Sequence, residues 1–504
     1  MSPNDVRPSR VLAIAVLFCW TVRSADAQTA IVNEAAGAAA ARIDAFFRRA
    51  AAFGQFDGAV LVAQQGRIVY ERAFGEANRE WHVPNTIDTR FEIASMTKAM
   101  TAIMVMQLVE ERKVLLDGHV SDYLPFYPRE TGSRITIDQL LTHTSGLQQD
   151  IAFPDDPSRV LPVVAQVNAD LLTNDSLVSL IAQRPLRFAP GTSYGYSSDG
   201  YAVLGAVVEH VTGVPYWDVL TRRVLRPAGM RETGVSILRP LVPKRASGYA
   251  QTFDGYENAP HIGVSPAGGL YSTLRDVYRF DRALSGNLLV RQVSKDRLFA
   301  TRSVATAYGW KTSEERRSNG TSRRILRTTG GLPGFGALLV RVPSEDRVIV
   351  LLSNTRDLEW RLDDFATTVQ HILDGEPHAP PRRSAAQIIA DAIRAGASAG
   401  ILEERFLTMR RDTATYVVSE AEMNRLGYYL LTQKRLGRAL TVFQLNVAAF
   451  PASANVYDSL GEGYMVSRDT ARAVENYRRS LALNPNNTNA IDMLKRLGAE
   501  PPVR

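Results

Sequence analysis

Residues 91–98 read F-E-I-A-S-M-T-K and lead directly into A-M-T-A-I-M-V-M-Q-L-V at residues 99–109. The second segment is apolar on nearly every face, which predicts a helix buried on all sides rather than an amphipathic surface helix. Ser95 and Lys98 then lie on one face of the first helical turn. Because burial disfavours a charged lysine, Lys98 must find a partner or lose its proton. A neutral amine can take a hydroxyl's proton, so the pair predicts an activated serine nucleophile.

Size, composition and charge are those of an ordinary soluble globular protein. A chain of 504 residues suggests two or more domains and supports a large core. Charged residues make up 22% and hydrophobic residues 45% of the chain, both within the usual range. The net charge of +7 comes from scattered arginine pairs, such as Arg222-Arg223 and Arg410-Arg411. This dispersion favours solvated faces over a nucleic-acid-binding surface, so we expect no nucleic-acid partner.

The N-terminus has the pattern of an export signal. Two arginines precede an apolar run at residues 11–20, and A-D-A at residues 25–27 fits the small-x-small cleavage pattern. The run is too short to span a membrane. Cys19, the only cysteine, would be removed with this segment and would leave no disulfide or thiol nucleophile. We therefore predict a signal peptide at residues 1–27 and a periplasmic or secreted protein with no membrane span after signal removal.

Two predicted strand pairs frame the first 370 residues. Residues 58–63 and 67–70 read as strands joined by a tight turn, and residues 336–342 and 347–353 read as a second pair. Helical and mixed patterns fill the sequence between them. This order predicts an α/β (α+β) fold in which a mostly antiparallel sheet, built from both ends of the domain, is flanked by helices and carries a helical subdomain.

Beyond a break after Asp374, the chain repeats itself with a period of 34 residues. Prolines and a pair of arginines mark a linker at this break. The positions that agree at this offset are Leu426-Gly427 with Leu460-Gly461, Ala439 with Ala473, Phe443 with Tyr477, and Pro451 with Pro485. The period and pattern resemble all-α tetratricopeptide repeats. Two repeats seldom bury enough surface alone. We therefore predict a linker and helical cap over residues 375–418 and repeats over residues 419–498, with a possible protein partner.

Four further motifs follow S-M-T-K along the chain. They are T-H-T-S-G-L at 142–147, P-G-T-S-Y-G-Y-S at 190–197, A-G-G-L-Y-S-T at 267–273 and T-G-G-L-P-G-F at 329–335. Together, in this order, the five motifs resemble the penicillin-recognising serine hydrolases. That superfamily includes ampC-type β-lactamases, D-alanyl-D-alanine peptidases and related esterases. The resemblance covers roughly residues 40 to 372 and implies a β-lactamase-like serine hydrolase domain over residues 28–374.

The resemblance implies roles for individual residues. Ser95 matches the acyl-accepting nucleophile and Lys98 its basic partner. Tyr196 matches the tyrosine that acts with the lysine as a proton shuttle, because the leaving group must also receive a proton. Ser198 stands where the family has an asparagine. A hydroxyl can still form a hydrogen bond, but it reaches less far and lacks the paired donor and acceptor of an amide.

The third motif of the family, usually Lys-Thr-Gly or His-Thr-Gly, reads Thr328-Thr329-Gly330 in this chain. The cationic or titratable first residue is absent, which weakens the expected recognition of a substrate carboxylate. Arg327 is adjacent, but alternation along a strand would turn it to the opposite face. The resemblance further implies that the backbone N–H groups of Gly331 and Ser95 form the oxyanion hole.

Two other residues resemble catalytic groups. Ser193 lies in a literal G-x-S-x-G at residues 191–195, but the nucleophile elbow of α/β-hydrolases needs a buried strand before it, and a proline-containing segment precedes this one. His143 is expected to shape the loop after a helix. The remaining histidines show no H-x-x-x-H spacing, so we expect no metal site, and the chemistry requires no cofactor.

The sequence thus predicts an exported serine hydrolase that forms an acyl-enzyme with a small-molecule or peptide substrate containing a scissile amide or ester. The altered second and third motifs favour an esterase or peptidase over an efficient β-lactamase. The alternative is a catalytically weakened binding or scaffold protein, which would use the pocket of the fold and recruit partners through the repeats.

Overall fold

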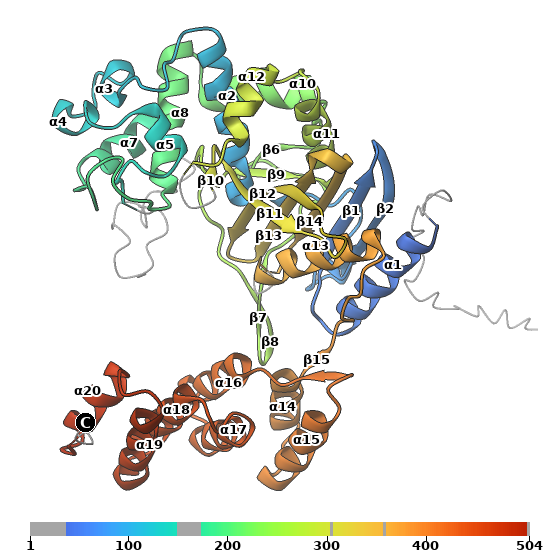
Figure 1. Ribbon diagram of the computed structural model, residues 1–504, viewed down its shortest axis with the longest axis vertical. Coiled ribbons are helices and arrows are strands. Elements are labelled where there is room, and N and C mark those ends of the chain that lie inside the picture. The colour runs from blue at the N-terminus through green and yellow to red at the C-terminus, as the bar shows by residue number, and fades with distance from the viewer. Residues whose placement is uncertain (1–36, 149–172, 303–305, 356–358, 501–504) are drawn as a thin grey trace, which may run out of the picture.

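A seven-stranded antiparallel sheet forms the centre of the first domain (Figure 1). The computed structural model describes residues 37–148, 173–302, 306–355 and 359–500. The strand order is β10-β11-β12-β13-β14-β1-β2. The strands are β1 (Gly58–Gln64), β2 (Arg67–Phe74), β10 (Thr306–Ala307), β11 (Trp310–Arg316), β12 (Ser322–Leu332), β13 (Phe335–Val342) and β14 (Arg347–Ser353).

The sheet is assembled from both ends of the domain. The N-terminal strand β1 pairs along its whole length with β14, from Gly58 opposite Ser353 to Gln64 opposite Arg347. Both predicted strand pairs are present at their predicted turns. The antiparallel sheet built from the two ends of the domain is therefore confirmed.

Shorter strands form small sheets around the central one. They are β3 (Glu76–Asn78) with β4 (Val83–Pro84); β5 (Phe91–Glu92) with β9 (Leu270–Ser272) and β6 (Gly234–Val235); β7 (Tyr249–Thr252) with β8 (Gly255–Asn258); and β15 (Arg383–Ser384) with β16 (Tyr416–Val417). The pairing of β5 with β9 matters most for the site, because it brings the segment before Ser95 beside the segment that follows residue 267.

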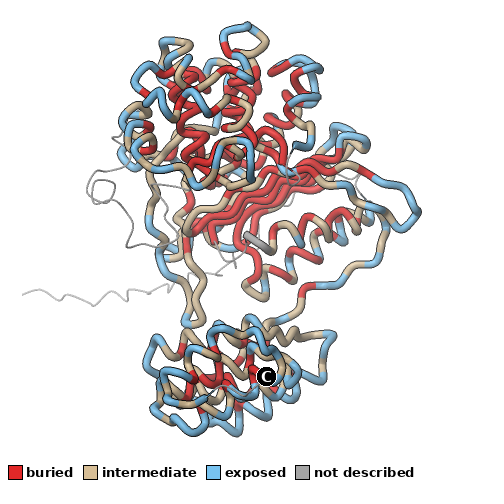
Figure 2. Tube along the Cα trace, turned by 60° about the vertical axis from the view of Figure 1, so that its left-hand side comes forward, coloured by how far each residue is buried: buried red, intermediate tan, exposed pale blue. Residues whose placement is uncertain are grey.

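Helices α1 (Gly37–Ala52) and α13 (Glu359–Asp374) pack together on one face of the sheet (Figures 1 and 2). Their contact is rich in phenylalanine: the ring of Phe47 lies 4.9 Å from that of Phe56 and 5.8 Å from that of Phe365. Such edge and tilted ring contacts bury large apolar areas. The terminal helices of the domain are therefore held on the face of the sheet away from Ser95.

A helical subdomain covers the opposite face. Its helices are α2 (Thr97–Glu110), α3 (Val120–Tyr123), α4 (Arg129–Gly132), α5 (Ile137–Leu141), α7 (Asn174–Ala182), α8 (Ser198–Thr212), α9 (Tyr216–Leu220), α10 (Arg226–Ala228), α11 (Leu274–Ser285) and α12 (Gln292–Phe299), with a π-helical turn at Thr221–Leu225. Helix α2 runs through the middle of this layer and is buried on nearly all sides, as its apolar sequence predicts. The expected start of this helix was wrong in one respect. Ser95 lies in a 3₁₀ turn before α2, because Ala94 adopts a left-handed φ of 46° that no α-helix contains.

The C-terminal part of the chain is all-helical and has its own hydrophobic core. Its helices are α14 (Ala385–Arg394), α15 (Ala399–Arg411), α16 (Glu420–Thr432), α17 (Leu436–Ala449), α18 (Ala454–Val466), α19 (Thr470–Leu483) and α20 (Thr488–Arg496). The 34-residue period has a physical basis here. A Cβ on Gly427 would lie 2.3 Å from the Phe443 ring, and one on Gly461 would lie 3.1 Å from the Tyr477 ring. Their identity as tetratricopeptide repeats stays a prediction.

The β7–β8 hairpin extends from the first domain to the C-terminal helices (Figure 1). The Phe253 ring at its tip lies 5.7 Å from the Tyr429 ring, and the Tyr429 hydroxyl donates to Asp254 at 2.8 Å. Arg394 donates to the Phe253 carbonyl at 2.7 Å. A second connection lies at the linker, where Gln55 donates to the Arg382 carbonyl at 2.5 Å. The two parts of the chain therefore touch at the hairpin and at the linker.

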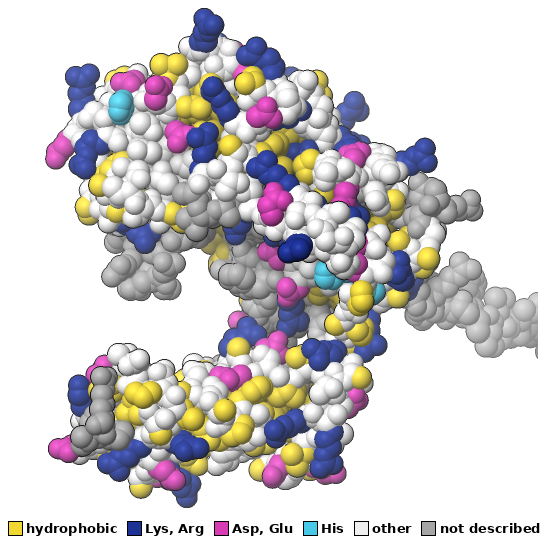
Figure 3. Space-filling model, viewed as in Figure 1, with side chains coloured by type: hydrophobic (Ala, Val, Ile, Leu, Met, Phe, Trp, Pro, Cys, Tyr) yellow, Lys and Arg dark blue, Asp and Glu magenta, His cyan; other side chains and the backbone are white. Residues whose placement is uncertain are grey.

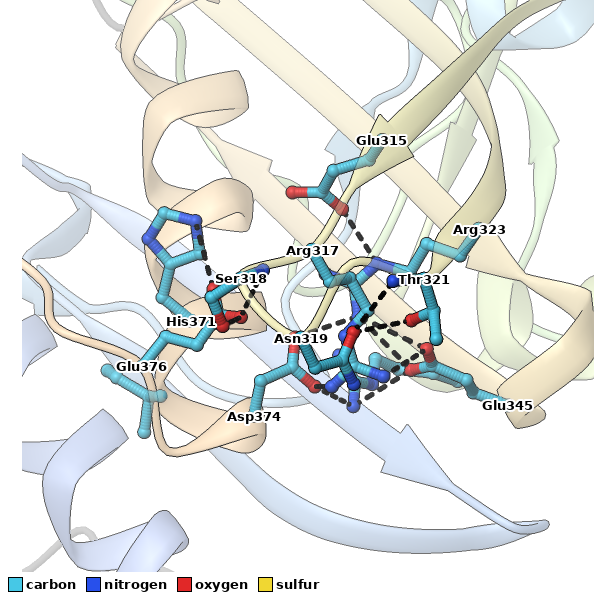
Figure 4. Close-up of polar contacts among 12 residues, drawn as sticks. Glu315, Arg317, Ser318, Asn319, Thr321, Arg323, Glu345, His371, Asp374 and Glu376 are labelled. Atoms are coloured by element: carbon cyan, nitrogen blue, oxygen red, sulfur yellow. Dashed lines mark hydrogen bonds and ion pairs between the residues drawn. The ribbon is translucent and has the colours of Figure 1, made fainter.

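A buried ion-pair cluster fixes the end of α13 (Figure 4). The Asp374 carboxylate forms ion pairs with three arginines: Arg317 at 2.9 Å, Arg323 at 2.8 Å and Arg347 at 2.7 Å. Glu345 accepts from Arg323 and Arg347 in the same cluster. Arg317 lies in the β11–β12 turn and Glu345 in the β13–β14 turn, Arg323 and Arg347 lie at the starts of β12 and β14, and Asp374 is the last residue of α13. The cluster thus holds two turns of the sheet to the helix from which the linker departs.

On the face seen in Figure 3, lysine and arginine side chains are dispersed among acidic and neutral ones, and apolar side chains gather on the C-terminal helices. Within the described ranges, none of the helices has both the length and the apolar character needed to cross a bilayer. The predicted signal peptide lies outside the described residues.

Candidate active site

The 3₁₀ turn Ala94–Met96 places Ser95 between β5 and α2, close against the backbone of two other segments. A Cβ on Gly330 of β12 would lie 2.0 Å from the Ile93 carbonyl oxygen, and one on Gly268 would lie 3.3 Å from the Ala94 carbonyl carbon. Glycine permits these approaches because it carries no side chain. The positive φ of Ala94 is a strained conformation of the kind that persists where surrounding structure enforces it. The turn is therefore tightly held from both sides.

The Ser95 hydroxyl contacts two groups that the sequence had predicted as its partners. Lys98 Nζ lies 3.0 Å from Ser95 Oγ, and the Tyr196 hydroxyl lies 2.9 Å from the same oxygen. Lys98 Nζ also contacts Ser198 Oγ at 3.1 Å and the Ala267 carbonyl oxygen at 2.8 Å. The Lys98 side chain is only 3% exposed, and within the described parts of the chain no carboxylate forms an ion pair with it. Its polar partners are thus two hydroxyls and one carbonyl.

The start of α8 fixes Tyr196 and Ser198 relative to one another. Ser197, between them, is the N-cap: its hydroxyl oxygen accepts from the Gly200 N–H at 3.2 Å, and its hydroxyl donates to the Gln148 carbonyl at 2.9 Å. This cap satisfies an otherwise free N–H of the helix terminus. As a result, Ser198 begins the helix with its hydroxyl toward Lys98, while Tyr196 lies just before it.

His143 supports this segment from behind. Its Nδ1 accepts a hydrogen bond from the Ser197 N–H at 3.2 Å, and its ring lies 4.6 Å from the Tyr196 ring at an angle of 34°. Burial and, after it, the nearby Lys98 together lower the pKa of His143 to about 3. A neutral ring that accepts at Nδ1 carries its proton on Nε2. His143 therefore has the contacts expected of a supporting residue.

The third predicted motif lies on an unpaired edge of the sheet. Strand β11 pairs with β12 only as far as Arg327, so residues 328–332 have β13 on one side and no ladder partner in β11 on the other. Thr328, at the start of this edge, is buried. The Arg327 Nε lies 3.7 Å from the Asp363 carboxylate of α13, yet Arg327 also lines the cavity at Ser95, contrary to the expectation that it would face away from the site. The free edge, which also carries Thr329, Gly330 and Gly331, runs alongside Ser95 and leaves backbone groups open to a substrate.

A small cavity of about 50 Å³ joins these groups. Ser95, Lys98, Tyr196 and Thr328 line it, together with β10–β11 residues that the sequence analysis missed: Thr306, Ala307, Gly309, Trp310 and Lys311. These five carry no motif, and only the pairing of β10 with β11 beside β12 brings them to the site. Arg327 and the exposed Lys311 each bring a cation to the cavity, beside the motif whose own first residue is uncharged.

Two sequence patterns fall outside this arrangement. Ser193 is exposed, in a loop that no strand immediately precedes, and it does not line the cavity. In the part of the chain that the structure describes, no group of three or more His, Cys, Asp or Glu side chains is placed to hold a metal ion. The Ala267 carbonyl, in contrast, contacts Lys98 directly. Its motif was recognised in the sequence, but this contact of its backbone oxygen was not.

Comparisons with known proteins agree with this geometry. Penicillin-binding protein 4* of Bacillus subtilis (strain 168) is 29% identical over 356 residues, which cover 66% of this chain and 75% of that protein. Esterase EstB of Burkholderia gladioli is 39% identical over 214 residues, covering 41% of this chain and 54% of that one. The crystal structure of a penicillin binding protein from Bacillus halodurans superimposes with a TM-score of 0.57 and 26% identity, over 65% of this chain and 98% of that chain. The family model described as Beta-lactamase matches residues 43–371. Because this match covers well over half of the sequence, the chain belongs to the Beta-lactamase family of serine hydrolases.

Proposed function

We propose that the protein is an exported serine hydrolase that cleaves an ester or amide through an acyl-enzyme on Ser95. The observation that carries this proposal is the position of Ser95 Oγ, 3.0 Å from Lys98 Nζ and 2.9 Å from the Tyr196 hydroxyl. A nucleophile within hydrogen-bond reach of a base, with a second proton carrier beside it, is the arrangement that acyl transfer requires. The export part of the proposal rests on the sequence pattern of residues 1–27.

In the acylation step, the uncharged amine of Lys98 accepts the Ser95 proton as Ser95 Oγ bonds to the substrate carbonyl carbon. The contacts of Lys98 with Ser198 and Ala267 occupy the hydrogens of the amine, which leaves its lone pair directed at Ser95. The N–H groups of Ser95 and Gly331 would stabilise the oxyanion.

In the steps that follow, the bond from the carbonyl carbon to the leaving group breaks, and the Tyr196 hydroxyl gives the leaving group a proton that it recovers from Lys98. Water then attacks the acyl-enzyme by the reverse sequence of proton transfers. It releases a carboxylic acid and restores the Ser95 hydroxyl. Each proton lost by the nucleophile is thereby returned, and the cycle consumes only water.

The substrate is proposed to be a small ester or a peptide-like amide, in preference to a β-lactam. Thr328 carries no charge at the position where the family motif has a cation, so a substrate carboxylate could be bound only by Arg327 or Lys311 elsewhere in the cavity, and Ser198 lacks the paired donor and acceptor of the family's asparagine. The 39% identity to an esterase over 214 residues supports the ester class. Because the chain is also similar to a penicillin-binding protein, amide substrates are tested together with esters.

We also propose the division of the chain into a signal peptide at residues 1–27, a hydrolase domain at 28–374, a linker and helical cap at 375–418 and tetratricopeptide repeats at 419–498. Helices α14 and α15 share one hydrophobic core with α16 to α20, which supports a cap that completes the repeats. The repeats would recruit a protein partner, a role that two or more stacked helix pairs commonly serve.

The test is intact-protein mass spectrometry after incubation with p-nitrophenyl esters, D-amino acid amides and penicillins. We expect a covalent adduct on the peptide that contains Ser95, and none in Ser95→Ala. Ser193→Ala is the matched control and should acylate as the wild type does. Turnover that survives in Ser95→Ala would refute the mechanism. A folded wild type that forms no adduct and hydrolyses none of these compounds would favour the binding-protein alternative.

A further inference from the structure

A second cavity, separate from the catalytic one, lies where α11 and α12 meet the ends of β13 and β14. It has a volume of about 360 Å³ and shares no lining residue with the cavity at Ser95. The charged side chains around it are Arg282, Lys295, Arg341, Arg347, Asp281 and Asp346. This volume is within the lower range of small-molecule sites. The cavity is therefore large enough for a ligand and is lined mainly by cations.

Lys295 is the unusual member of this wall. It is 7% exposed, and its Nζ contacts the carbonyl oxygens of Ser285 at 3.1 Å and Gly286 at 3.0 Å. Among the described residues no carboxylate lies within ion-pair distance of it. A buried ammonium normally has a charged partner, since desolvation is otherwise costly. Burial lowers the pKa of Lys295, and repulsion from Arg341 lowers it further.

Arg341 approaches the same serine from the other side. It is 6% exposed, its Nη2 donates to Ser285 Oγ at 2.8 Å, and its Nε donates to the Asp281 carboxylate. Ser285 thus contacts two cations, one through its backbone and one through its side chain. Ser285 Oγ also donates to Asp281 Oδ2 at 3.4 Å, so Arg341 has a counter-charge at this residue, whereas Lys295 forms no ion pair among the described residues.

The carboxylates of the wall are already engaged. Asp281 accepts from Arg341 and from Arg282, and Arg282 also pairs with Asp346 at 2.6 Å. Arg347 pairs with Asp374 in the cluster at the end of α13. Lys295 is therefore the cation of this wall that forms no ion pair among the described residues, although the neighbouring Asp296 carboxylate opposes the lowering of its pKa.

We propose that this cavity binds a small oxyanion of the phosphate class, held between Lys295 and Arg341. An ammonium and a guanidinium are the side chains that bind phosphate oxygens best. The volume exceeds the need of a bare phosphate and leaves room for the small organic part of a phosphate monoester. A different role for Lys295 would be to cap the C-terminal carbonyls of α11, and that role requires no anion.

The test measures binding to the full-length protein by calorimetry and by thermal unfolding. The ligands are inorganic phosphate and glycerol 3-phosphate, with potassium chloride at equal ionic strength as the reference. We expect saturable binding and a rise in Tm with phosphate concentration. A tighter constant for the monoester than for phosphate would identify the organic phosphate as the intended ligand, and equal constants would identify phosphate itself.

Three variants locate the binding. Lys295→Gln should weaken phosphate binding about tenfold or more, because one charge-assisted hydrogen bond is lost. Ser285→Asp places a carboxylate beside both cations and should abolish phosphate binding. Because Ser285 Oγ also lies 3.4 Å from Asp281 Oδ2, the new carboxylate faces a like charge, so circular dichroism and Tm establish that this variant is folded before its binding is compared. Lys244→Gln, at an exposed lysine paired with Asp88, should bind as the wild type does. The proposal is overturned if the wild type shows no effect beyond chloride, or if Lys295→Gln and Ser285→Asp bind phosphate undiminished.

Discussion

Replacement of Gly330 by alanine tests how closely β12 must approach the turn that holds Ser95. The added methyl carbon would lie 2.0 Å from the Ile93 carbonyl oxygen and 2.8 Å from the Ile93 carbonyl carbon. An ordinary C···O contact is about 3.3 Å, so the two segments must separate by about 1.3 Å. Both are backbone, so no side-chain rotation can relieve the clash. Ser95 is two residues beyond Ile93 and would move with it, away from Lys98 and Tyr196.

A misplacement of about 1 Å at a catalytic group costs on the order of 10²-fold in rate. We therefore expect kcat/KM of Gly330→Ala for p-nitrophenyl acetate to fall about 10²-fold. Initial rates measure this, and circular dichroism establishes that the variant is folded. Gly437→Ala is the control, because a Cβ at Gly437 meets no atom within 4 Å, and it should keep full activity. A folded Gly330→Ala with the wild-type kcat/KM would refute the reasoning.

Three further predictions concern the proton shuttle, the ion-pair cluster and the contact between the domains. Tyr196→Phe removes the hydroxyl 2.9 Å from Ser95 and should lower kcat about 10²-fold to 10⁴-fold with little change in KM; steady-state kinetics measures it, and a loss below threefold would contradict it. Asp374→Asn should lower the free energy of unfolding by about 3 kcal/mol in urea titrations, because two buried arginines and the part-buried Arg317 lose a shared partner; a loss of a few tenths would be too small for a buried pair. Burial alone would raise the pKa of Asp374, but the neighbouring arginines hold it below its ordinary value, so its stabilisation is complete above about pH 4 and is lost as the pH falls through the lower, folded pKa. The difference between the wild type and Asp374→Asn should therefore shrink below about pH 4, and a difference independent of pH would disprove this link. Phe253→Ala removes the ring contact with Tyr429 and should separate the unfolding of the two domains in calorimetry, whereas an unchanged single transition would show that the hairpin does not couple them.

Local patterns accounted for the elements that pack by simple periodicity. The two hairpins that frame the sheet followed from short apolar runs and turn residues, and the burial of α2 followed from its uniform apolarity. The start of α2 could not be predicted in this way. Alanine rarely adopts a left-handed φ, so nothing in the sequence indicates that Ala94 does. The extent of the β7–β8 hairpin toward Tyr429 was also not evident, since no local pattern reports a contact with a distant domain.

The residues of the candidate site likewise comprise some that the sequence could predict and some that it could not. The pairing of Ser95 with Lys98 could be predicted because residues three positions apart on a helical turn lie on the same face. Tyr196 and Ser198 could be placed only through the resemblance to a family, since they lie about one hundred residues further along the chain. The Ala267 carbonyl and the wall around Trp310 could not be assigned, because a backbone oxygen and an unremarkable strand carry no chemical label in sequence.

Patterns in the amino-acid sequence were sufficient to predict the buried helix, the serine–lysine pair beside its start, the strand pairs at both ends of the domain and the 34-residue period of the C-terminal helices. These depend on spacings of a few residues or on direct repetition. The packing of distant segments, in contrast, gives Lys98 three oxygen partners, one of them 169 residues away, and brings an unpaired edge of β12 to Ser95. Such contacts arise when separately formed elements pack, and packing depends on the shapes of all their surfaces together. For the same reason, the cation-lined cavity beside α12 could not be predicted from the sequence, because its walls come from separate segments, namely α11, α12 and the ends of β13 and β14.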